Sequence, residues 1–195
     1  MRLVLIRHAP TASTRRAAFS LDESLDEAGT RAAGRLAPSL PAHCKHCVSS
    51  PALRARQTAQ AAGWVPVVDP DLAECDFGSW AGRTLEEVQA EDPEGLASWF
   101  TDPEAVPHAG ESLAQLLARV QGFLGRVRGS DGTTAAFTHA GVIRAAVVAA
   151  LRAPIESFWR IDIAPLSTTE LHATADGWRV AGVNRSQGGS LEVGR

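Results

Sequence analysis

Lysine is nearly absent from this chain of 195 residues, because Lys45 stands alone and every other basic side chain is an arginine. Basic and acidic residues almost balance, and the formal net charge is −3. A chain with so little net charge has no global field that would draw it to nucleic acid or to a membrane surface. We therefore expect neither as a partner, and the sequence leaves the oligomeric state open.

Long hydrophobic runs are also lacking. No stretch of about 18 apolar residues occurs, the length that indicates a membrane-spanning helix. The apolar run Leu3–Ile6 is too short for a signal peptide and leads directly into charged residues. The cysteines Cys44, Cys47 and Cys75 are few and odd in number, which without a secretion signal favours reduced thiols. These absences predict a cytoplasmic protein.

Length and periodicity predict one α/β domain. An apolar fraction of 45% is ordinary for a chain that buries a full core. Short apolar runs typical of strands alternate with helical patterns: strands at Leu3–Ile6, Cys47–Ser49, Val65–Val68 and Thr133–Phe137, and helices at Asp26–Leu36, Ala52–Ala62, Glu111–Arg128 and Val142–Leu151. We expect a three-layer α/β/α fold with a mostly parallel central sheet.

The remaining segments complete this expectation. The polar segment Thr11–Glu23 predicts a loop. Residues 71–107 read as a small helical insertion over one end of the sheet, with short helices at Thr84–Glu91 and Glu94–Phe100. The C-terminal part is typical of strands, at Trp159–Ile163, Thr168–Thr174 and Trp178–Val183, with Asp176 and Gly177 as a hairpin turn between the last two. The domain is expected to span residues 1–184, and the Gly/Ser-rich tail 185–195 to be loosely held.

Candidate reactive side chains fall where strands end, which is where ligands bind in parallel α/β sheets. Arg7 and His8 directly follow the first strand. Arg54 lies in the first turn of the helix after the second strand, and His139 lies between the fourth strand and the next helix. A neutral imidazole is a good nucleophile toward phosphorus, and guanidinium groups and helix N-termini hold phosphoryl oxygens. Glu74, in an apolar stretch that contains tryptophan, can serve as a general acid.

Each of these signals has an ordinary structural alternative. A histidine at a strand end often binds backbone, a loop carboxylate often caps an amide, and an arginine on a helix is often solvated. For Arg56 we prefer that last alternative. It is the combination of two histidines, two arginines and one acid at strand ends that favours phosphoryl chemistry.

Four segments carry a resemblance to a known family. They are the strand followed by Arg-His at 3–8, Ser-Ser-Pro-x-x-Arg-Ala at 49–55, Glu-x-x-Phe-Gly-x-Trp-x-Gly at 74–82 and Thr-His-x-Gly-Val-Ile-Arg at 138–144. In this order they resemble the histidine phosphatase superfamily, also called phosphoglycerate mutase-like, from Leu3 to about Asn184. The resemblance implies a phosphatase of small-molecule phosphomonoesters, such as α-ribazole phosphate or sugar phosphates, that needs no metal or other cofactor.

The resemblance also implies a role for each candidate. His8 would be the nucleophile that becomes phosphorylated. Arg7, Arg54 and His139 would bind the phosphoryl group, and Glu74 would donate a proton to the leaving oxygen. Thr14 stands where relatives often have an asparagine that touches the phosphate, and its hydroxyl could still donate. Ala9 and Ala140 stand where many relatives have glycine, which has more conformational freedom.

Two other functions compete with this one. A phosphoglycerate mutase of the same superfamily must hold and reload its product, but this chain is short and its Glu74–Gly82 segment resembles the phosphatase branch. A non-catalytic phospho-ligand binder would not need the full set of candidate side chains.

Other motifs are left outside the predicted site. His43–Cys47 looks like half of a zinc site but lacks a second Cys/His pair, so we expect no metal there. Glu111 and Ser112 begin a helix and are not placed in the catalytic set. The aromatic residues Trp80, Trp99 and Phe100 could line a substrate cap, but we prefer to place them in the core of the insertion.

Overall fold

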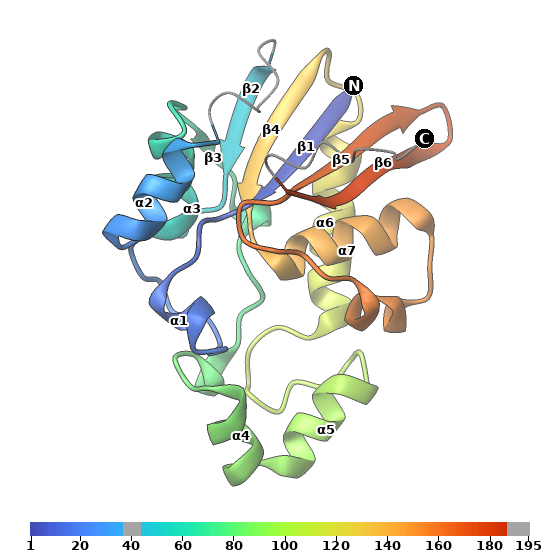
Figure 1. The fold of residues 1–195 in the computed structure, drawn as a ribbon. Coiled ribbons are helices and arrows are strands. Elements are labelled where there is room, and N and C mark those ends of the chain that lie inside the picture. Colours follow the sequence, from blue (N-terminus) through green and yellow to red (C-terminus); the bar gives the residue numbers. More distant parts are fainter. Residues whose placement is uncertain (37–43, 187–195) are drawn as a thin grey trace, which may run out of the picture.

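The computed structural model describes residues 1–36 and 44–186, and Figure 1 shows how their helices and strands are arranged. The strands are β1 Arg2–Arg7, β2 Cys44–Ser49, β3 Val67–Val68, β4 Thr133–Thr138, β5 Thr168–Thr174 and β6 Gly177–Arg185. The α-helices are α1 Ala12–Arg15, α2 Glu27–Gly34, α3 Leu53–Ala61, α4 Leu85–Glu91, α5 Pro93–Thr101, α6 Leu113–Val127 and α7 Ala140–Leu151. Short 3₁₀ helices are η2 Pro70–Leu72, η3 Gly78–Trp80 and η4 Ile155–Arg160.

The strands form one sheet in the order β3-β2-β4-β1-β5-β6. The first four of these are parallel to their neighbours, and β5 and β6 add an antiparallel edge. Helices α2 and α3 cover one face of the sheet, and α6 and α7 cover the other (Figure 1). The predicted three-layer fold with a mostly parallel sheet is confirmed.

The central strand β1 shows why the layers form. Leu3 and Leu5 belong to the large apolar cluster that α6 and α7 complete, whereas Val4 and Ile6 belong to the smaller cluster on the side of α3. Successive side chains of a strand point to opposite faces, so an unbroken apolar run requires cover on both sides.

Capping residues set the helix starts. The Asp26 side chain accepts a hydrogen bond from the Gly29 amide, so the predicted N-cap of α2 is confirmed. Ser112 and Gln115 form a reciprocal capping box at the start of α6.

Three local predictions need correction. The predicted loop after β1 contains the one-turn helix α1, capped by the Thr11 hydroxyl. The predicted strand Trp159–Ile163 is wrong, because this part of the chain forms η4 and then an extended segment outside the sheet. The hairpin turn consists of Ala175 and Asp176, one residue earlier than predicted, and Gly177 begins β6.

The strand prediction failed because its apolar residues pack against another element instead of alternating across a sheet. Ile163 is fully buried, and the ring of Trp159 packs against that of Phe100 on α5 with centroids 4.8 Å apart. A short apolar run does not say which partner buries it.

Helices α4 and α5 lie beyond the carboxyl ends of the parallel strands (Figure 1). Trp80 and Trp99 are 2% and 4% exposed and belong to the large apolar cluster, as preferred from the sequence. Phe100, on the same helix as Trp99, is instead 43% exposed. Among the described residues, no helix is long and apolar enough to cross a bilayer. The predicted loose tail lies, from residue 187 onward, outside the described residues.

Candidate active site

Arg54 joins the two histidines at the carboxyl edge of the sheet. It lies in the first turn of α3 and is 3% exposed. Its Nε donates to His8 Nε2 at 3.2 Å, and its Nη2 donates to His139 Nδ1 at 3.1 Å. The remaining Nη1 donates to the Leu21 carbonyl oxygen at 2.7 Å. One guanidinium therefore connects the end of β1 with the junction between β4 and α7.

The hydrogen-bond partners fix the tautomer of each imidazole. His8 Nδ1 lies 2.7 Å from the Ala9 carbonyl oxygen, which can only accept, so Nδ1 carries the hydrogen and Nε2 presents a lone pair. Arg54 can only donate, so His139 accepts at Nδ1 and donates from Nε2 to Ser50 Oγ at 2.7 Å. The two rings lie edge-on, with centroids 5.1 Å apart and an interplanar angle of 62°.

Burial keeps both imidazoles neutral. His8 is 3% exposed, and burial, followed by the positive charge of Arg54, lowers its pKa to about 3. The pKa of His139 is also far below its ordinary value, because this fully buried ring faces Arg54 and His8. At neutral pH the His8 ring is therefore unprotonated at Nε2.

Arg7 adds a second guanidinium at the end of β1. It donates from Nη1 to the Ile163 carbonyl oxygen at 2.5 Å. Its Nε is buried, and within the described part of the chain it has no hydrogen-bond partner. An unpaired buried donor next to His8 is costly unless a ligand satisfies it.

Glu74 reaches the start of α7, beside His139. Its carboxylate accepts from the backbone amides of Cys75 at 3.1 Å and Gly141 at 3.4 Å. A Cβ added at Gly141 would lie 2.3 Å from Glu74 Oε1. Glycine at position 141 is therefore required for the carboxylate to come this close to the helix N-terminus.

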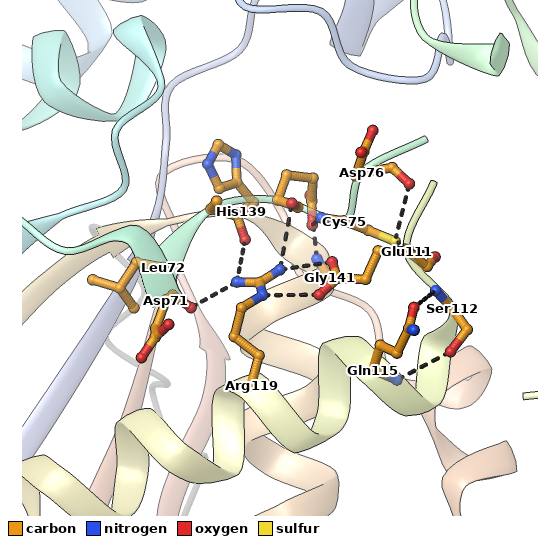
Figure 2. A network of polar contacts seen from close by, with 12 residues as sticks. Asp71, Leu72, Cys75, Asp76, Glu111, Ser112, Gln115, Arg119, His139 and Gly141 are labelled. Atoms are coloured by element: carbon orange, nitrogen blue, oxygen red, sulfur yellow. Dashed lines mark hydrogen bonds and ion pairs between the residues drawn. The ribbon is translucent and has the colours of Figure 1, made fainter. Parts of the chain in front are cut away.

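A half-buried arginine of α6, Arg119, holds the segment that carries Glu74 (Figure 2). Arg119 binds both carboxylate oxygens of Glu111, at 2.9 and 2.8 Å. It also donates to the carbonyl oxygens of Asp71 at 2.7 Å, Ala73 at 3.0 Å and Glu74 at 3.5 Å. These contacts tie the backbone on both sides of Ala73 to α6.

Three further residues were singled out from the sequence. The Thr14 hydroxyl pairs with that of Thr11 at 2.9 Å, and its described hydrogen bonds do not join it to His8, Arg54 or His139. Ala9 and Ala140 have no positive φ, so alanine fits the backbone at both positions. The Ala9 amide donates to Thr58 Oγ1 at 3.0 Å, which holds the chain behind His8.

Sequence reasoning missed Ser50, Thr58 and Arg119 as parts of this site. Ser50 lies in a segment that carries the family resemblance, and that was the available signal for it. Thr58 and Arg119 look like polar positions on amphipathic helices, and only the packing of those helices brings them to the site.

The described part of the possible zinc motif, Cys44 to Cys47, lies in β2, and His43 is outside the described residues. Over residues 1–36 and 44–186, no group of three or more His, Cys, Asp or Glu side chains is arranged to hold a metal ion.

Comparison with known proteins identifies the family. The family model of the histidine phosphatase superfamily (branch 1) matches residues 3–186 of this chain. A bifunctional protein of Mycobacterium tuberculosis is 35% identical over 184 residues, which cover 88% of this chain and 50% of that protein. Phosphoserine phosphatase 1 of Hydrogenobacter thermophilus is 31% identical over 182 residues, with 88% and 86% covered. The solved structure of mycobacterial glucosyl-3-phosphoglycerate phosphatase with VO3 superimposes with a TM-score of 0.84 at 28% identity, with 95% of this chain and 99% of that chain covered.

The fold is thus that of an α/β protein in which two buried imidazoles lie around Arg54 at the strand ends. The chain belongs to the histidine phosphatase superfamily, as its motifs predicted. It spans about half the length of the mycobacterial relatives to which it is 35% identical.

Proposed function

We propose that this chain is a phosphatase that hydrolyses small phosphomonoesters through a phosphohistidine formed on His8. The observation that carries the proposal is the Arg54 guanidinium, which is buried between two neutral imidazoles and donates to both. A phosphoryl group that enters this space would receive the donors that Arg54 now gives to the histidines. Arg7 Nε, buried and unpaired among the described residues, would supply another.

In the first step, His8 Nε2 attacks phosphorus and the bond to the ester oxygen breaks. Glu74 gives its proton to that oxygen, which leaves as an alcohol. Arg54, Arg7, His139 and the amides at the start of α7 stabilise the charge on the transferring oxygens.

In the second step, water attacks phosphorus and the P–N bond to His8 breaks. Glu74, now a carboxylate, takes a proton from the water, and inorganic phosphate leaves. The protein groups supply all the positive charge of this scheme, so the reaction needs no metal ion. We further propose a cytoplasmic location, in keeping with three cysteines that are free thiols.

The test is phosphate release from phosphomonoesters in the presence of a chelator. We expect free phosphate, and activity that survives chelation. Loss of activity with the chelator and recovery with a divalent ion would contradict the mechanism. Transfer of label between positions of phosphoglycerate without free phosphate would indicate a mutase, and tight phosphate binding without turnover would indicate a binding protein.

A further inference from the structure

A cavity of about 180 Å³ lies beside Glu74, and its described lining residues do not include Arg54, His8 or His139. Its catalytic wall is formed by Glu74 and by the first turns of α7, through Ala140, Gly141 and Arg144. The facing walls come from elements far apart in the sequence and are almost entirely apolar: Phe19, Cys75, Phe77, Leu85, Trp99, Phe100, Leu116, Phe158 and Trp159.

The rings that line this cavity support one another. The centroids of Phe19 and Phe77 are 4.9 Å apart, and those of Phe100 and Trp159 are 4.8 Å apart in an edge-on arrangement. Phe100 and Leu85 are 43% and 42% exposed, although both line the cavity. Large apolar side chains left open to water around a concave site are typical of ligand-binding surfaces.

Polar groups are scarce in the same lining. Arg144 donates from Nε to the Ile161 carbonyl oxygen at 2.8 Å, and its guanidinium lies 5.6 Å from the centre of the Phe158 ring. The Cys75 thiol donates to the Glu111 carbonyl oxygen at 3.3 Å. A leaving group rich in hydroxyls or charges would find few partners here and would lose its bonds to water.

We propose that the cavity binds the alcohol part of the substrate and selects phosphomonoesters whose alcohol carries an aromatic or other bulky apolar group. This rests on the proposed function, because it takes Glu74 as the group beside the leaving oxygen. The phosphoryl group would lie at Arg54, and the alcohol would extend past Glu74 between Phe100, Trp159 and Phe77.

The experiment compares kcat/KM for 2-phenylethyl phosphate, ethyl phosphate and glycerol 3-phosphate. All three release an ordinary alcohol, so differences report the fit of the leaving group more than its acidity. We expect the phenylethyl ester to be preferred over the ethyl ester by roughly 10- to 100-fold, the gain that burial of a phenyl group provides. Equal values, or a preference for glycerol 3-phosphate, would overturn the proposal.

Two variants locate the preference. Phe100→Ala and Trp159→Ala should remove most of the advantage of the phenylethyl ester and change turnover of the ethyl ester much less, which also shows that they fold. Trp64→Ala is the matched control, because Trp64 packs against the apolar cluster on the other face of the sheet. If Trp64→Ala reduces the preference as much as Trp159→Ala does, the cavity is not its source.

Binding of phosphonates separates this proposal from the proposed function. Neither benzylphosphonate nor methylphosphonate can be hydrolysed, so calorimetry measures their binding without turnover. Benzylphosphonate should bind more tightly than methylphosphonate, because its ring would enter the apolar cavity. Hydrolysis of all esters at equal rates with equal phosphonate affinities would refute the aromatic preference and leave the phosphatase intact. Tighter benzylphosphonate binding without hydrolysis of any ester would support the aromatic preference of the cavity and refute the phosphatase.

Discussion

Arg54 is the residue on which the proposed chemistry depends most. Its three nitrogens donate to His8, His139 and the Leu21 carbonyl oxygen, so one side chain contacts the proposed nucleophile and places positive charge beside both imidazoles. Arg54→Ala should lower kcat/KM by roughly 10²- to 10³-fold or more, because it removes a donor from the transferring group.

Arg56→Ala is the matched control for this change. Arg56 lies two residues further along α3 and is half-buried, not fully solvated as preferred from the sequence. Its Nε, like that of Arg7, is buried without a hydrogen-bond partner among the described residues, but no described hydrogen bond joins Arg56 to either histidine. Its variant should retain activity near that of the unmodified protein in a steady-state phosphatase assay. If the two variants lose activity alike, the assignment of phosphoryl binding to Arg54 is wrong.

His8 should also make the stability of the protein depend on pH. Its pKa is about 3 in the folded chain, against an ordinary 6.5. Between these values the unfolded chain binds a proton that the folded chain does not, so acidification favours unfolding. The contribution is absent above about pH 6.5 and reaches about 2 kcal/mol at pH 5, at about 1.4 kcal/mol per pH unit.

Denaturant unfolding in phosphate-free buffer tests this. His8→Gln should lose less unfolding free energy than the unmodified protein between about pH 7 and about pH 5, by about 2 kcal/mol. His46→Gln changes an exposed histidine of β2 and should leave the dependence as it was. An identical pH dependence for His8→Gln and the unmodified protein would mean that His8 takes up a proton freely in the folded state.

The positions of the main site residues could be foreseen because they follow from topology. Parallel strands bring their carboxyl ends to one edge of the sheet. Arg7 ends β1, His8 and His139 directly follow β1 and β4, and Arg54 lies in the first turn of the helix after β2. Their partners could not be foreseen in the same way. Whether Ser50 or Thr58 reaches an imidazole or a backbone amide depends on side-chain packing that no local pattern records.

At the scale of elements, helix α6 positions the segment of Glu74 through Arg119. The guanidinium binds Glu111 and three carbonyl oxygens of residues 71–74. Arg119→Met should therefore displace Glu74, the proposed proton donor, and leave the proposed phosphoryl site around Arg54 in place. An alkyl phosphate needs a proton on its leaving oxygen, whereas nitrophenolate leaves well unaided. We expect kcat to fall at least about tenfold for an alkyl phosphate and much less for 4-nitrophenyl phosphate.

Arg126→Met provides the control on the same helix. Arg126 is 53% exposed and pairs with Asp69 and Asp71, just before the segment that Arg119 holds. Arg126→Met should change kcat little for either the alkyl phosphate or 4-nitrophenyl phosphate. Equal losses of kcat for the alkyl and nitrophenyl esters in Arg119→Met would show that Arg119 supports the fold in general and not Glu74 in particular.

Elements with strong local signals were predictable. Helix α6 carries an apolar stripe and a capping box, and β1 is an unbroken apolar run. The segment after α7 was not predictable, because Trp159 packs on α5, which lies some 60 residues away in the sequence. Tertiary packing decided between strand and 3₁₀ helix there.

At the scale of the whole molecule, the sheet and helices α4 and α5 contribute different groups to the region around Glu74. The carboxyl edge of the sheet gathers the charged and imidazole groups, and helices α4 and α5 lie beyond that edge (Figure 1). Glu74 stands between them, in contact with the start of α7 and lining the aromatic cavity. In the proposed reaction, the phosphoryl group would lie at Arg54 and the alcohol in the cavity, with Glu74 between them.

The most direct measurement of the central claim is to trap the phosphorylated protein. Reaction with a substrate labelled in its phosphoryl group, quenched rapidly without acid, should leave label that is stable to base, labile to acid and located on His8. His8→Ala should abolish both the label and turnover. Label on a cysteine or serine, or turnover that survives His8→Ala, would contradict the account.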